Sequence, residues 1–187
     1  AREALRQLVR SSDYRISLSY GPQREDRYNR TLAHLYLLDG TSVQGHLLRQ
    51  GLATAFTTPP NDTRSACYRE AETQAMKKNR GIWSLPRYQS KTLQQLSSHD
   101  RGFHRIRGRV TRVYFGKKAV WIHLGRDRGK SLRLRINHRD LANFDRRSLQ
   151  TLQGKSIAVR GWLHPRKDHI FMALRHRDAL IIDNNTD

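Results

Sequence analysis

The stretch that decides the fold is residues 103–115, FHRIRGRVTRVYF, in which apolar and basic side chains alternate. Ile106, Gly108 and Val110 share one face of an extended strand, whereas Val113 and Phe115 fall on the opposite parity. An alternation that changes parity within one strand predicts a β-bulge near residues 108–112, where the strand bends.

Alternation continues after this long strand. Four further strands are predicted over residues 120–124, 132–136, 155–163 and 169–174, with a helical segment over 140–152 between the third and fourth strands of the series. Three strands, a helical connection and two more strands is the order of a five-stranded barrel of the OB type. The sequence therefore predicts a basic OB-like domain over residues 103–182.

The first half of the chain has a mixed pattern. We expect helices over 1–10, 43–52 and 64–79, strands over 14–20 and 31–38, and a charged turn over 21–30. Residues 85–102 are mostly polar and contain a proline, which predicts a linker. The expected fold class is mixed α+β, with an N-terminal unit over residues 1–84 and a second, small β-barrel.

Charge indicates the class of partner. The 187 residues carry 36 Lys+Arg and 16 Asp+Glu, a net charge of +20, and residues 101–187 hold 21 of the basic and 7 of the acidic residues. Such a concentrated, one-signed excess favours a polyanion, because Lys and Arg displace condensed counterions from a phosphate backbone. An anionic membrane would favour a basic amphipathic helix, whereas these basic segments alternate as strands do. The charge pattern therefore predicts a nucleic-acid partner.

The outward positions of the barrel are the first candidates for contact with nucleic acid. If the even-numbered apolar residues point inward, the residues that point outward are Arg105, Arg107, Arg109, Trp121, His123, Arg133 and Arg135. Rings beside guanidinium groups are typical of single-strand binders, because bases stack on the rings while cations hold phosphates. Single-stranded DNA and RNA are both expected partners. In an alternative interpretation, Trp121 packs against the linker or the first domain, and exposed arginines protect strand edges.

A series of short motifs marks the first half. In chain order they are DRYNR (26–30) followed by LA (32–33), DG (39–40), LLRQGLA (47–53), PNDT (60–63) and GIW (81–83). With these motifs at this spacing, residues 1–84 resemble the later part of the staphylococcal-nuclease, or thermonuclease-like, domain. The resemblance implies an OB-like barrel of five strands with three helices, and residues 1–84 have no counterpart of its first three strands.

The same resemblance implies calcium-dependent phosphodiester hydrolysis. Of the family's active-site residues, only the second arginine has a counterpart, Arg30, which would stabilise charge on the phosphoryl group. Arg27, Tyr28 and Phe56 are candidates for contact with nucleic acid. The family's calcium-binding aspartates and its water-activating glutamate belong to the three missing strands. We therefore expect no metal site in this chain, and calcium only together with the upstream part of the domain.

Two functions fit these expectations. The chain could be the C-terminal portion of a calcium-dependent phosphodiesterase whose carboxylate site lies upstream. Alternatively, it could be a catalytically inactive module that binds nucleic acid or protein. Two strands and three helices cannot close a five-stranded barrel, so we expect an upstream segment or a second chain to complete the first barrel.

Overall fold

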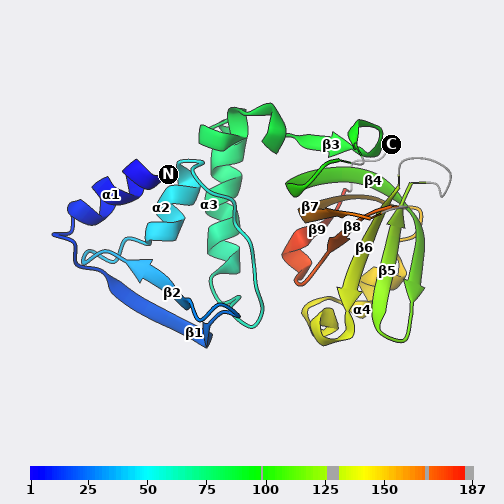
Figure 1. The fold of residues 1–187 in the computed structure, drawn as a ribbon, viewed down its shortest axis with the longest axis horizontal. Coiled ribbons are helices and arrows are strands. Elements are labelled where there is room, and N and C mark those ends of the chain that lie inside the picture. The colour runs from blue at the N-terminus through cyan, green and yellow to red at the C-terminus, as the bar shows by residue number, and fades with distance from the viewer. Residues whose placement is uncertain (98, 126–130, 167–168, 184–187) are drawn as a thin grey trace. The chain divides into compact units, whose positions relative to one another are not determined.

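The structure is a computed structural model that describes residues 1–97, 99–125, 131–166 and 169–183. The chain divides into two compact units, Ala1–Pro86 and Arg87–Asp187 (Figure 1). Among the described residues, no helix combines the length and the apolar character needed to cross a membrane.

The first unit combines a two-stranded sheet with helices. Its elements are α1 (Arg2–Arg10), β1 (Ser17–Glu25), β2 (Thr31–Tyr36), α2 (Val43–Arg49), α3 (Ser65–Lys77) and the short 3-10 helix η1 (Gly81–Ser84). Strands β1 and β2 pair antiparallel (Figure 1). Helix α2 begins after Ser42, whose Oγ accepts a hydrogen bond from the Gly45 amide at 3.1 Å and so caps the helix.

Strand β1 differs from the expectation that residues 14–20 are the strand and 21–30 the turn. The strand begins only at Ser17, because Asp13 and Tyr14 adopt positive φ angles in the turn that follows α1. It then continues to Glu25, and the Asn61 side chain bonds both the backbone amide and the carbonyl of Gln23, at 3.0 and 2.7 Å. A side chain distant in sequence therefore supports the polar end of this strand.

Helix α3 anchors the extended segment that carries Phe56. Ala71 and Ala75 are buried, as their spacing predicts, and Glu72 is buried between them. The Glu72 Oε1 atom accepts a hydrogen bond from the Ala55 amide at 2.8 Å. This bond attaches residues next to Phe56 to the helix.

The second unit contains the closed five-stranded barrel. The barrel strands are β4 (Gly102–Phe115), β5 (Ala119–Leu124), β6 (Leu132–Asn137), β7 (Ser156–Pro165) and β8 (Ile170–Ala173). Between β6 and β7 lie the 3-10 helix η4 (His138–Asn143) and α4 (Arg146–Gln150); η5 (Arg177–Ala179) and β9 (Leu180–Ile182) follow β8. The strand order is β4-β5-β6-β8-β7, and β7 pairs back with β4 to close the sheet (Figure 1).

This topology confirms the OB-like barrel predicted from the alternation. Strands β6 and β8 are parallel, and the remaining barrel pairs are antiparallel. The predicted bulge is present, because the register of β4 on β5 shifts between Val110 and Arg112. The even-numbered residues Ile106, Ile122 and Leu134 are fully buried in the barrel core, so the odd positions of β5, of β6 and of β4 before the bulge point outward.

Residues 87–102 do not form the linker that their polar composition suggests. They belong to the second unit and contain η2 (Pro86–Tyr88, at the boundary), β3 (Ser90–Thr92) and η3 (Leu93–Gln95). Strand β3 pairs parallel with the first half of β4, and Leu93 and Leu96 are buried in the barrel core. Two leucines in a polar segment therefore attach it to the barrel.

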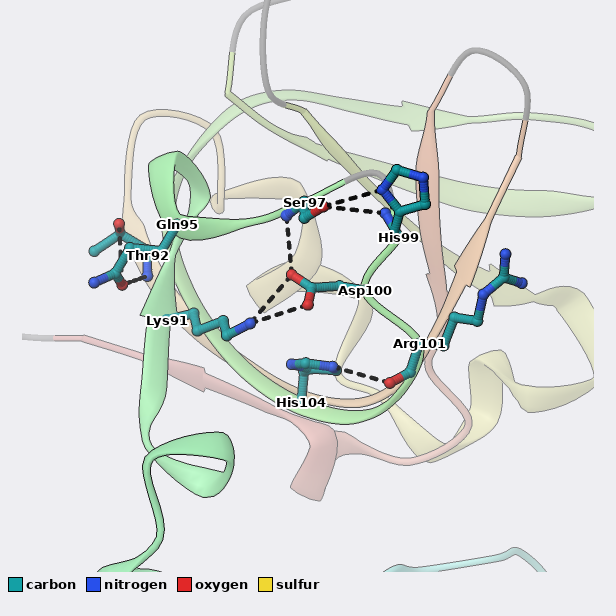
Figure 2. Close-up of polar contacts among 8 residues, drawn as sticks. All are labelled: Lys91, Thr92, Gln95, Ser97, His99, Asp100, Arg101 and His104. Atoms are coloured by element: carbon teal, nitrogen blue, oxygen red, sulfur yellow. Dashed lines mark hydrogen bonds and ion pairs between the residues drawn. The ribbon is translucent and has the colours of Figure 1, made fainter.

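A partly buried ion pair fixes this attachment. Lys91 Nζ donates to both carboxylate oxygens of Asp100, at 3.0 and 3.2 Å, and the Ser97 amide donates to Asp100 Oδ2 at 2.9 Å (Figure 2). Burial alone would raise the pKa of Asp100, but the bonds from Ser97 and Lys91 outweigh it and hold the pKa below its ordinary value.

Candidate nucleic-acid interface

Outward side chains of β4, β5 and β6 form one surface with alternating rings and cations. Cross-strand register places Tyr114 opposite Trp121 and Trp121 opposite Arg135. One row along, Arg112 lies opposite His123, and His123 lies opposite Arg133. We call this surface the Trp121 face; it consists of Arg112, Tyr114, Trp121, His123, Arg133 and Arg135.

Within the Trp121 face, guanidinium groups lie close to aromatic rings. The guanidinium carbon of Arg135 is 6.0 Å from the centroid of the Trp121 ring, and that of Arg112 is 5.9 Å from the Tyr114 ring. Tyr114 is 52% exposed, so a ring is available to a base beside these cations. This arrangement combines stacking surface with positive charge, as single-strand binders do.

The acids that the structure describes in the second unit do not neutralise the positive charge of this face. Each acidic residue described there contacts another partner: Asp100 with Lys91, Asp140 with Arg139 and Arg175, Asp145 with the amides at the start of α4, Asp178 with His176, and Asp183 with Arg107. The potential of the Trp121 face is therefore set by its arginines.

Three arginines of β4 that were predicted to contact nucleic acid lie outside the Trp121 face. Arg105, Arg107 and Arg109 lie on the part of β4 that pairs with β7, opposite Arg160, Ala158 and Ser156. Arg107 also forms an ion pair with Asp183 at 3.6 Å. These arginines add positive charge to the unit, but the residues directly opposite Trp121 and His123 on β4 are Tyr114 and Arg112.

Arg112 and Tyr114 were not among the residues predicted from the sequence to contact nucleic acid, although the change of parity along β4 indicated them. Because Val113 and Phe115 change parity after the bulge and pack on the core, the residues between and before them must point outward. Phe171 on β8 was also omitted, since its position beside Arg133 depends on the parallel pairing of β6 and β8. That pairing joins strands distant in sequence.

In the first unit, Arg30 lies at the turn between β1 and β2. Its Nε and one terminal nitrogen both lie 2.7 Å from Asp26 Oδ2, and its side chain is 73% exposed. Asp26 Oδ1 accepts hydrogen bonds from the amides of Tyr28 and Arg30, at 2.8 and 3.0 Å. The Arg30 amide is the main cause that lowers the pKa of Asp26, and the Tyr28 amide and the Arg30 guanidinium act in the same direction.

Tyr28 lies between two cations at this turn. The guanidinium carbons of Arg27 and Arg30 are 4.7 and 5.2 Å from its ring centroid, and Arg27 also donates to the Tyr28 hydroxyl at 2.6 Å. Tyr28 is 60% exposed and Phe56 is 45% exposed. The turn therefore presents a ring and two guanidinium groups, with one carboxylate already bound to Arg30.

Comparison with known proteins identifies this unit. Residues 1–85 match the family model described as staphylococcal nuclease homologue. Residues 1–85 are therefore staphylococcal-nuclease-like. The Trp121 face lies outside this staphylococcal-nuclease part of the chain, whereas Arg30, Tyr28 and Phe56 lie within it.

Proteins named as nucleases are among the relatives of this chain. The chain is 36% identical over 72 residues to a thermonuclease of Staphylococcus intermedius, covering 38% of this chain and 42% of that protein. It is 34% identical over 100 residues to the SPbeta prophage-derived endonuclease YokF of Bacillus subtilis (strain 168), covering 53% and 30%. It is also 37% identical over 84 residues to the endonuclease YncB of the same strain, covering 44% and 39%. The chain thus matches less than half the length of each relative.

Calcium, which the staphylococcal nuclease family implies, does not fit the residues described. A calcium ion needs six to eight oxygen ligands. Within residues 1–97, 99–125, 131–166 and 169–183, no three His, Cys, Asp or Glu side chains come together as a metal site. The carboxylate nearest Arg30 along the chain, Asp26, already uses both oxygens in the turn.

Proposed function

We propose that this chain holds single-stranded DNA or RNA as the nucleic-acid-binding part of a staphylococcal-nuclease-like phosphodiesterase. The observation that carries the proposal is the Trp121 face, where Trp121 and Tyr114 adjoin Arg135 and Arg112 with no described carboxylate among them. Rings would stack bases while the arginines hold phosphates. The endonuclease relatives support a nucleic acid as the substrate of the whole protein.

Catalysis in this proposal depends on groups outside residues 1–187. Arg30 would stabilise negative charge on the phosphoryl oxygens through the terminal nitrogen that does not contact Asp26. The carboxylates that hold calcium and activate water would come from an upstream segment or a second chain, which would also complete the first barrel. Support for this division comes from the absence of a carboxylate cluster in the described part of the chain.

A catalytically inactive module is the second candidate. The bond between Arg30 and Asp26 favours it, because a guanidinium held by a carboxylate has less charge available for a phosphoryl group. In that case the chain would bind nucleic acid or protein without cutting it.

Preference for single strands tests the binding part of the proposal. Binding of the full chain to a 20-nucleotide single strand of DNA or RNA should be roughly tenfold tighter than to a duplex of the same length, because only unpaired bases expose faces for stacking. Fluorescence anisotropy titrations measure both affinities. Equal or tighter binding to the duplex would contradict the proposal.

Replacement of Arg30 tests the catalytic part. In the full-length gene product with calcium, Arg30→Ala should lower kcat for phosphodiester cleavage roughly tenfold and change KM little, since charge on the phosphoryl group is greatest in the transition state. Arg27→Ala, next in the same turn, is the matched control and should leave kcat nearly unchanged. A rise in KM at constant kcat would instead assign Arg30 to substrate positioning.

A further inference from the structure

The ring of Phe171 on β8 is contacted by three polar side chains that carry nitrogen atoms. The guanidinium carbons of Arg135 and Arg166 lie 5.6 and 5.3 Å from its centroid, and the His164 ring stacks on it at 5.0 Å with an interplanar angle of 26°. Arg135 lies on β6, His164 lies on β7 and Arg166 directly follows β7, and the barrel topology brings these segments together around β8. We call Phe171, Arg135, Arg166 and His164 the Phe171 cluster.

Register adds a third arginine to the cluster's row. Phe171 lies opposite His164 on β7 and opposite Arg133 on β6. Because β6 is the shared strand, the cluster continues the Trp121 face at its end on β8. A nucleic acid on that face would therefore reach the Phe171 cluster.

Charge in this cluster is not balanced by an acid within the described residues. There, the guanidinium groups of Arg135 and Arg166 contact rings and form no hydrogen bond or ion pair, and the Nε of Arg135 is buried without a partner. Gathering like charges costs free energy unless an anion binds between them. The arrangement is therefore suited to an anionic ligand.

The turn around Tyr28 provides an internal comparison. There too, two arginines lie within 5.2 Å of one ring, but Asp26 contacts Arg30 and neutralises part of the charge. The Phe171 cluster has the same ring and arginine geometry, and no carboxylate of the described residues contacts its arginines. Its guanidinium groups are therefore suited to an anionic ligand.

We propose that the Phe171 cluster binds a terminal phosphomonoester of a nucleic-acid strand. A phosphomonoester carries about −1.5 to −2 charges at pH 7 and three acceptor oxygens, whereas each internal phosphodiester carries one negative charge. Two guanidinium groups and an imidazole N–H provide donors for several of those oxygens. This inference rests on the proposed function, because the strand that bears the phosphate must lie on the Trp121 face.

Three forms of one oligonucleotide test the proposal. A 12-nucleotide single strand with an internal fluorophore is prepared with a 5′-phosphate, with a 3′-phosphate, or with hydroxyl groups at both ends. We expect the full chain to bind one phosphorylated form roughly fivefold tighter than the hydroxyl form, because each exposed ion pair contributes modestly. The arm that gains affinity identifies which end of the strand reaches the cluster.

A double variant assigns the effect to the cluster. Arg166→Gln with His164→Gln should abolish the preference for the phosphorylated form and leave binding of the hydroxyl form within about twofold. Arg177→Gln, another exposed arginine of the same unit, is the control and should keep the preference. Equal binding of the three forms by the wild type would overturn this inference alone, and so would an equal loss for all three in the double variant. Failure of all three forms to bind would overturn the proposed function as well.

Discussion

Raising NaCl from 50 to 200 mM should weaken binding of this chain to a single-stranded oligonucleotide roughly a hundredfold. Each phosphate neutralised by Lys or Arg releases condensed counterions, and for single strands the log–log slope is about −0.7 per phosphate. If about five phosphates are neutralised, the slope is about −3.5, which over a fourfold change in salt gives this loss. Anisotropy titrations at four or more salt concentrations measure the slope.

Single substitutions test which arginines contribute to this salt dependence. Arg133→Gln should make the slope shallower by about 0.7, because one phosphate contact is lost. Arg177→Gln, exposed on the same unit, should leave the slope unchanged. A flat slope in the wild type would contradict electrostatic binding and would favour the protein-interaction module.

Local patterns predicted the barrel well, because its strands obey a simple rule. Apolar side chains at alternate positions, such as Ile106, Ile122 and Leu134, are buried on the inner surface, so the alternation reports directly on the fold. The bulge was also visible, as the change of parity between Val110 and Val113. Both features depend on neighbours within a single strand.

Features that depend on distant residues were not predictable in the same way. Polar residues 21–25 extend β1, where Asn61 bonds Gln23, and residues 87–102 join the second unit, where Leu93 and Leu96 enter its core. The amino-acid composition of these segments does not reveal either contact, because each depends on residues outside the segment. For the same reason Phe171 was not recognised as a neighbour of Arg135, since 36 positions separate them in the chain.

The turn that contains Arg30 shows another feature that the sequence alone did not predict. In the DRYNR motif, the cation next to Asp26 in the sequence is Arg27, whereas Arg30 is four positions away. The structure instead joins the Asp26 carboxylate to the Arg30 guanidinium, and Arg27 bonds the Tyr28 hydroxyl. The pairing is decided by the left-handed conformation of Asn29, which brings the amide and side chain of Arg30 back toward Asp26.

Combined removal of a ring and a cation should affect affinity far more than removal of two cations elsewhere. Trp121→Ala with Arg135→Ala should weaken binding of a single-stranded oligonucleotide roughly a hundredfold, since one stacked base contributes about 1–3 kcal/mol and Arg135 holds a phosphate beside it. Arg87→Ala with Arg177→Ala removes two positive charges, one more than the first variant, from exposed positions of the second unit. This control should lose only a fewfold in affinity.

Comparison of the two double variants separates geometry from charge count. Circular dichroism and thermal unfolding of both should match the wild type, because the four side chains point away from the barrel core or lie outside it. If the Arg87 and Arg177 variant loses as much affinity as the Trp121 and Arg135 variant, or more, net charge alone holds the nucleic acid, and the Trp121 face is not a site. If the first loses much more, the alternation of Trp121 with Arg135 across β5 and β6 is what converts a basic barrel into a single-strand binding surface.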